Sequence, residues 1–165
     1  MAVAMYVNFK EIPGECKESI HKSWMQIEHI QFNVRQNASA RRSTGGSTTS
    51  GEADFGAIVV RMLMDSAYPK LAESCWLGKH HDDVTIDFCR SGMDKQLFHQ
   101  YKFKNALITS VNVVADAAGD DSLPVVEYSF VYDEITNEYF QTDSHGGGIS
   151  GSTITGFNVQ KRDSV

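Results

Sequence analysis

The stretch Asp65–Lys79, DSAYPKLAESCWLGK, decides the fold, because it is the one segment whose apolar residues recur with the period of a helix. These residues follow the spacing i, i+3, i+4, i+7 and i+8, which places them on a single face. They are Tyr68, Leu71, Ala72, Cys75 and Trp76. We therefore predict a helix over residues 66–78 whose core face carries Tyr68, Leu71, Cys75 and Trp76.

Both ends of this helix carry the residue types that helix termini favour. Asp65 or Ser66 can cap the first turn, since a short side-chain oxygen accepts hydrogen bonds from the unpaired amide groups there. Pro69 is compatible only with that first turn, where its missing N–H costs nothing. Gly78 follows the last apolar residue, where a left-handed cap is favoured.

The rest of the chain alternates apolar and polar residues with period two, which is typical of strands. A slip in the alternation predicts a bulge or bend near Glu28–His29, and Asn105 is predicted to mark a bend between two strands. The expected strands cover residues 5–9, 24–35, 57–64, 84–89, 97–113, 126–132 and 135–140. Seven or more strands separated by turns indicate a mainly β sandwich or barrel, with the helix packed on it.

The chain of 165 residues is long enough for one domain with its own core, which we place at residues 1–142. Residues 37–56 are small and polar, and a compact domain rarely keeps so long a loop without using it or leaving it mobile. Both alternatives remain open. We predict that residues 143–165, which are rich in glycine, form a flexible tail with at most a short strand near residues 157–159.

Composition excludes several classes of protein. A net charge of -6, without a basic stripe, disfavours nonspecific nucleic-acid binding. The N-terminus has neither a cationic leader nor a continuous apolar core, so we expect no cleaved signal peptide, and no run is long enough for a transmembrane helix. Three cysteines without metal-like spacing predict free thiols formed in a reducing cytoplasm.

Motifs for chemistry are weak. The run His80–Asp83 invites a metal site, but adjacent residues splay apart and no second ligand pair supports them, so we interpret the run as a solvated loop. A hydrolase would need a nucleophile motif such as G-x-S-x-G, which is missing. We therefore predict no catalytic residues, no metal and no cofactor.

The order of several short motifs resembles the haemolysin-coregulated protein (Hcp) family, the tube-forming secreted component of type VI secretion systems. Each motif alone is weak, and their order over residues 1–142 carries the resemblance. The motifs are Met5–Phe9 with Gly14–Cys16, His21–Lys22, Asp65–Leu71 with Gly78–His80, Tyr101–Phe103 with Leu107–Val111, and Val126–Phe130 with Tyr132.

The resemblance implies a barrel of two antiparallel sheets with one lateral helix, similar to phage tail-tube proteins. It implies a non-enzymatic subunit that forms rings of six, stacked inside a contractile sheath beneath a spike protein. It also implies secretion from the bacterial cytoplasm, with effectors possible as cargo in the channel and with neither nucleic-acid binding nor membrane insertion.

A head-to-tail stack brings opposite faces of a ring together, so unlike charges can meet at every junction. We predict contacts between basic residues of the long loop and an acidic turn: Arg41 and Arg42 with Asp116, Asp120 and Asp121. The alternative function is a monomeric β-sandwich module that binds a carbohydrate or cell-wall ligand. That module would need an exposed aromatic platform, whereas most aromatic residues here alternate inward.

Overall fold

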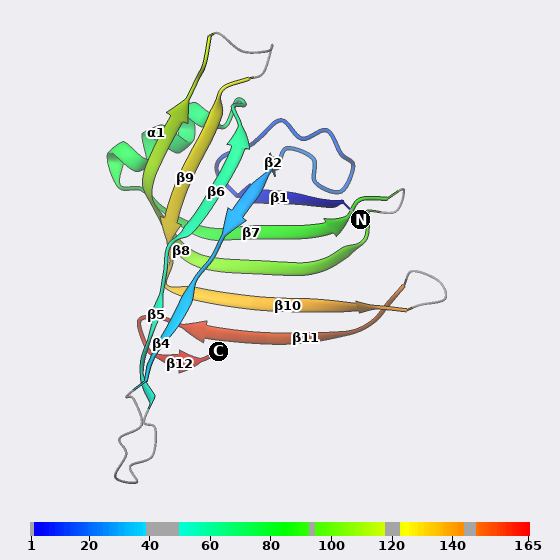
Figure 1. The fold of residues 1–165 in the computed structure, drawn as a ribbon, viewed down its shortest axis with the longest axis vertical. Coiled ribbons are helices and arrows are strands. Elements are labelled where there is room, and N and C mark those ends of the chain that lie inside the picture. The colour runs from blue at the N-terminus through cyan, green and yellow to red at the C-terminus, as the bar shows by residue number, and fades with distance from the viewer. Residues whose placement is uncertain (1, 39–49, 93–94, 118–122, 144–147) are drawn as a thin grey trace.

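The computed structural model describes residues 2–38, 50–92, 95–117, 123–143 and 148–165. Within these ranges the chain forms twelve strands and one helix, and every strand pair is antiparallel (Figure 1). The elements are β1 Val3–Phe9, β2 Met25–Ile27, β3 His29–Gln31, β4 Val34–Ala38, β5 Ser50–Phe55, β6 Ile58–Leu63, α1 Tyr68–Leu77, β7 His80–Arg90, β8 Leu97–Val114, β9 Val125–Val131, β10 Glu134–Thr142, β11 Ile149–Asn158 and β12 Asp163–Ser164.

Ten strands form one sheet, which runs in the order β12-β11-β10-β8-β7-β1-β2. From β8 the sheet also continues through β9 and β6 to β3, and these strands cross the first set as a second layer (Figure 1). The mainly β prediction is confirmed. The predicted barrel is not closed, because the sheet ends at β12, β2 and β3, and none of these three strands pairs with another of them.

Strand β8 joins the two layers by changing partners. Up to Leu107 it pairs with β7, and beyond Leu107 it pairs with β9. The change follows Asn105, whose φ of 52° lies in the left-handed region that asparagine tolerates. The predicted bend is therefore in the right place, but it lies within one strand of 18 residues and does not separate two.

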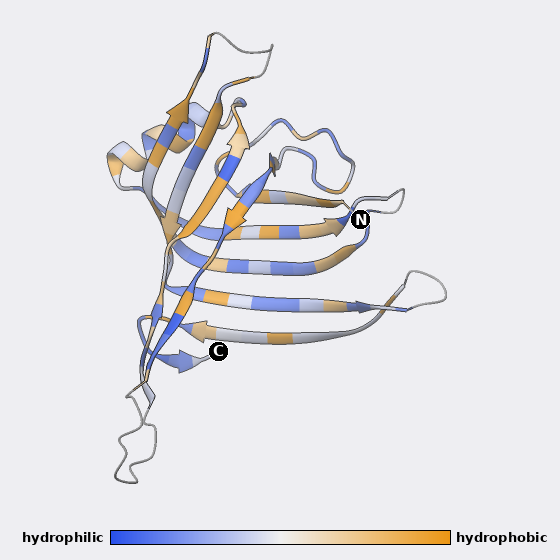
Figure 2. Cartoon of the chain, in the orientation of Figure 1, coloured by the Kyte–Doolittle hydropathy of each residue, from blue (hydrophilic) through white to orange (hydrophobic). Residues whose placement is uncertain are grey.

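The core lies between the two layers. Alternate residues of β6, β7 and β9 point into it, so apolar and polar residues alternate along these strands (Figure 2). At its centre the ring of Phe9 meets those of Tyr128 and Phe130 edge to face, at centroid distances of 6.0 and 5.6 Å. Phe103 meets Phe130 at 5.3 Å in the same way. This geometry is favourable for aromatic pairs.

Helix α1 is shorter than predicted and is rotated about its axis. Leu71 and Ala72 are buried, whereas Trp76, predicted for the core face, is 79% exposed. At 100° per residue, Trp76 lies about 140° around the axis from Leu71. Ser74 lies about 60° from Leu71 and is also buried, and Cys75, about 40° away on the other side, is partly buried against the core. The prediction for Trp76 is therefore wrong, because the face that meets the core centres on Leu71, and Trp76 points away from it.

The ends of α1 differ in how well the sequence predicted them. The N-cap residue is Ala67, which makes no side-chain cap bond. Asp65 instead accepts a hydrogen bond from the Ala67 amide at 2.9 Å, in the turn before the helix. Gly78 ends the helix in the left-handed conformation, with φ of 61°, as its position predicted.

Three segments predicted to be irregular contain strands. Residues 80–83 begin β7, so the expected solvated loop is wrong, and His81 is buried there. Residues 37–56 were predicted as a loop, but β4 and β5 form a two-stranded sheet that includes residues 37–38 and 50–55. Residues 149–158 of the predicted flexible tail form β11, which pairs with β10 throughout, because β10 leaves an edge that needs backbone partners.

Candidate assembly surfaces

A serine, a histidine and a glutamate approach one another beneath α1. The Nε2 atom of His81 lies 3.1 Å from Ser74 Oγ, and its Nδ1 atom lies 3.9 Å from Glu11 Oε2. Burial lowers the pKa of His81, which favours the neutral ring. However, Ser74 is only 4% exposed, and Glu11 pairs with Lys79 at 2.8 Å. The serine hydroxyl therefore cannot reach a substrate, and the contact attaches α1 to β7.

A second buried polar cluster surrounds His21, in the segment between β1 and β2. Its Nδ1 lies 2.7 Å from Glu18 Oε2 and its Nε2 lies 3.0 Å from Asp87 Oδ2, while Tyr6 stacks on the ring at 4.2 Å. Burial opposes the charge of Glu18, but hydrogen bonds from amides and from His21 outweigh it and lower the pKa of Glu18 to about 2. Burial raises the pKa of the nearby Cys89 thiol to about 11, so that thiol is a poor nucleophile. The cluster holds the segment on the sheet.

Within the described ranges, no group of three or more His, Cys, Asp and Glu side chains is arranged to hold a metal ion. All three cysteines are free. No helix among the described residues is long and apolar enough to cross a membrane. With its titratable clusters buried, the surfaces of the molecule become the candidates for function.

One such surface is the solvent-facing side of the layer formed by β3, β6, β9 and the end of β8. One row across it joins His29, Arg61, Glu127 and Asn112 by direct cross-strand pairing, and Arg61 Nη2 donates to Glu127 Oε2 at 3.1 Å. The neighbouring row carries hydroxyls, with Ser129 Oγ 2.5 Å from Ser110 Oγ. This surface is polar and presents paired charges.

The same layer becomes apolar at one end of the long axis of the molecule (Figure 2). We call this end the apolar rim and define it as Leu63, Val114, Leu123 and Val125. Leu63 pairs with Val125, which pairs with Val114, so three of the four form a row across the sheet. Leu63, Val114 and Leu123 are 40%, 67% and 57% exposed.

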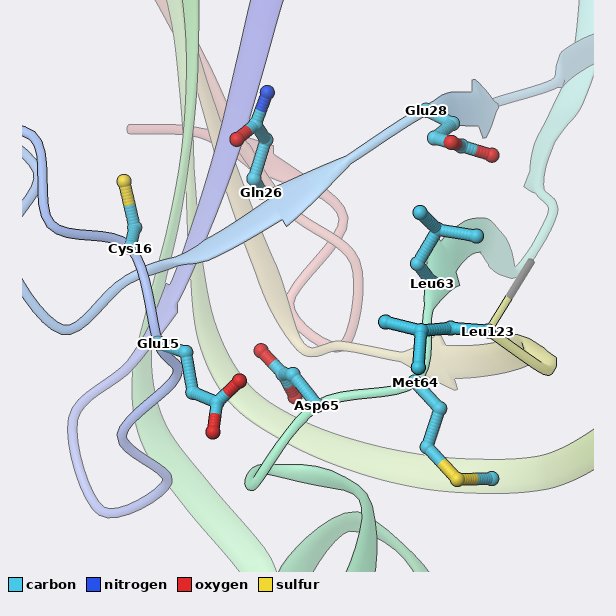
Figure 3. A pocket seen from close by; sticks show the side chains of 8 residues that line it. All are labelled: Glu15, Cys16, Gln26, Glu28, Leu63, Met64, Asp65 and Leu123. Atoms are coloured by element: carbon cyan, nitrogen blue, oxygen red, sulfur yellow. The ribbon is translucent and has the colours of Figure 1, made fainter. Parts of the chain in front are cut away.

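A cavity of about 280 Å³ lies beside the apolar rim (Figure 3). Leu63 and Leu123 form part of its wall, and three carboxylates from separate segments face it: Glu15, Glu28 and Asp65. Burial raises the pKa of Asp65, although the Ala67 amide partly offsets this effect. The rim is therefore an apolar surface bordered by acidic groups.

The opposite end of the long axis is formed by β4 and β5, which project from the body as a separate two-stranded sheet (Figure 1). We call this sheet the arm. It directly continues β3 and β6, because only two residues separate each strand from the next. The two ends of the molecule are thus unlike, as head-to-tail association requires.

The predicted stacking residues are only partly described. Asp116 is exposed just beyond the end of β8, at the same end of the molecule as the apolar rim. Arg41, Arg42, Asp120 and Asp121 lie outside the described residues. The sequence analysis missed the apolar rim, although the consecutive valines at 113–114 and 125–126 were a signal, because they make a strand apolar on both faces.

Helix α1 offers a further apolar surface. Trp76 and Leu77 are 79% and 71% exposed at its C-terminal end. Tyr139, on β10, is the other aromatic side chain among the strongly exposed large hydrophobic residues of the described chain. Trp76 and Tyr139 lie on different elements, and the ring of Tyr139 contacts those of Phe98 and His99, at centroid distances of 6.5 and 6.3 Å.

Solved structures share this fold. One, described as the structure of a type six secretion system protein, matches with a TM-score of 0.92 and 24% identity over 99% of this chain and 100% of its own. Hcp1 from Salmonella typhimurium matches with a TM-score of 0.78 and 16% identity over the full length of both chains. A type VI secretion system effector from Yersinia pestis matches with a TM-score of 0.75 and 21% identity over 94% and 99%. No curated relative matches by sequence.

These matches define the class of the fold, that of type VI secretion proteins. The sequence itself matches the family model described as "Type VI secretion system effector, Hcp" over residues 6–139. The chain belongs to the Hcp family of type VI secretion proteins.

Proposed function

We propose that this chain is a non-enzymatic subunit of the inner tube of a type VI secretion apparatus. In this proposal six copies form a ring, rings stack inside a contractile sheath beneath a spike protein, and the channel can carry effectors. Membership of the Hcp family supports the proposal. The observation that carries the stacking part is the contrast between the two ends of the long axis, the arm at one and the apolar rim at the other.

Stacked rings would place the arm end of one ring against the apolar rim of the next. The rim exposes valine and leucine side chains that a neighbouring copy would remove from water. The predicted pairing of Arg41 and Arg42 with Asp116, Asp120 and Asp121 would add charge complementarity at the same junction, with about 0–1 kcal/mol for each exposed pair. Because each junction between two rings would repeat these contacts around the ring, contacts that are weak one by one could together hold the two rings.

The polar layer of β3, β6, β9 and β8 is our candidate for the channel wall. Its strands run along the long axis, from the arm toward the apolar rim (Figure 1). Its solvent-facing side combines a paired arginine and glutamate with a row of hydroxyls. These polar groups bind water readily, as the wall of a water-filled channel requires.

Native mass spectrometry and negative-stain microscopy test this proposal. We expect a species six times the 18.3 kDa of the chain, and tubes under conditions that favour association. Val114→Asp should leave rings intact and prevent tubes, because it places a charge on the apolar rim. Ile20→Asp is the matched control, since Ile20 is also 67% exposed but lies on the segment before β2. A wild-type chain that stays monomeric at micromolar concentration contradicts the proposal.

A further inference from the structure

Phe55, at the base of the arm, packs against the core, and the rest of the arm needs a support to keep its direction. Its strands pair only with each other, from Val34–Phe55 at the base to Ala38–Ser50 at the far end. All five residues of β4 are exposed. A two-stranded sheet of this kind is marginally stable by itself in water.

The C-terminal hairpin lies against this arm (Figure 1). Strand β11 ends at Asn158, whose side chain accepts a hydrogen bond from the Lys161 amide at 2.7 Å and closes the turn into β12. Strand β12 then pairs with the last two residues of β11, and the Val165 amide donates to the Gly156 carbonyl at 3.1 Å. The end of the chain is thereby fixed beside the arm.

Two contacts join the hairpin and the arm. The rings of Phe55, in β5, and Phe157, in β11, stack with centroids 5.1 Å apart and planes inclined by 15°. Farther along the arm, Arg162 Nη1 lies 2.9 Å from Glu52 Oε2. Both charged groups are more than half exposed, so the ring stack is the stronger of the two contacts.

The space around the ring stack is incompletely filled. A groove of about 290 Å³ lies on one side, between arm residues such as Ala53 and hairpin residues such as Val159. Another, of about 220 Å³, separates the base of the arm from β10 and β11 and is lined by Phe32, Val34 and Ile135. Grooves therefore lie on both sides of the ring stack, which joins the arm to the hairpin between them.

We propose that the C-terminal hairpin β11–β12 is a brace that sets the direction of the arm through Phe157 and Arg162. The family model ends at residue 139, so this role belongs to a part of the chain outside the matched region. A consequence, which rests on the proposed function, is that the brace controls ring stacking, because an arm without a fixed direction cannot meet the next ring in register.

Amide hydrogen exchange tests the brace independently of tube formation. The full chain is measured as rings that are not stacked into tubes. Phe157→Ala should raise amide exchange in Val34–Ala38 and Ser50–Phe55 roughly tenfold, the equivalent of about 1.4 kcal/mol. Exchange in β6 and β9 should not change. Ile154→Ala, an exposed position on the same strand, is the matched control and should change neither.

Phe55→Ala keeps the test decisive if Phe157→Ala fails to fold, since it removes the same stack from the arm side. The double variant should exchange no faster in the arm than either single variant, because both remove one contact. Unchanged exchange in the arm of both single variants overturns the brace.

Negative-stain images of the same proteins test the consequence. A variant whose arm exchanges faster, and which forms rings but no tubes, supports the link between the brace and ring stacking. A variant whose arm exchanges faster but which forms as many tubes as the wild type overturns that link. If the wild-type chain makes rings but no tubes, the stacking part of the proposed function fails, and the exchange result still decides whether the brace exists.

Discussion

Tyr128 buries a hydroxyl group that has no hydrogen-bond partner among the described residues. The residue is fully buried on β9, and its ring packs edge to face on Phe9. Burial, reinforced by the nearby charge of Asp65, raises the pKa of Tyr128 far above its ordinary value, so the hydroxyl remains neutral. An unsatisfied buried polar group costs about 1–3 kcal/mol of stability.

Tyr128→Phe removes that hydroxyl and keeps the ring contacts. Part of the gain is lost because the missing oxygen leaves a small void with fewer dispersion contacts. We therefore expect the free energy of unfolding to rise by about 1 kcal/mol. Urea denaturation at pH 7 measures it, with both proteins at one concentration, because assembly makes apparent stability depend on concentration.

Tyr139→Phe is the control, since Tyr139 is 47% exposed and its hydroxyl can bind water. Its effect should stay within about 0.5 kcal/mol. A loss of 1 kcal/mol or more in Tyr128→Phe would refute the reasoning, because it would mean that a partner such as a buried water satisfies the hydroxyl.

Two further predictions concern α1 and its contact with β7. Leu71→Ala should lower the free energy of unfolding by about 2–5 kcal/mol, as large-to-small changes in a core do. Trp76→Ala should lower it by less than about 0.5 kcal/mol when the chains are dissociated, because Trp76 is exposed. If urea melts give the reverse order, the helix presents its other face to the sheet. Burial lowers the pKa of His81 in the folded chain below the pKa of the same histidine in the unfolded chain. As the pH falls below about 6.5, the unfolded chain therefore binds more protons than the folded chain. The free energy of unfolding should thus be highest above about pH 6.5 and decrease below it. His81→Gln should show a smaller loss between pH 7 and pH 5 in the same melts, and an equal loss in both proteins would assign the effect to other groups.

The sequence by itself determined the local structure where one residue type fixes the backbone. Gly78 predicted the left-handed end of α1, and Asn105 predicted the bend in β8, because glycine and asparagine tolerate the left-handed conformation better than other residues. Alternation with period two predicted most strands, since it requires only one buried and one exposed face. The order of short motifs along the chain also indicated the family that the family model then showed.

The tertiary structure decided which surface each element presents. Trp76 belongs to the apolar stripe of α1, yet the helix packs through Leu71 and the small Ser74, because the depth of burial depends on what lies opposite. Likewise, β11 forms from residues with weak apolar alternation because the edge of β10 supplies its hydrogen-bond partners. The apolar rim and the brace join residues far apart in the chain, so only the folded structure brings them together.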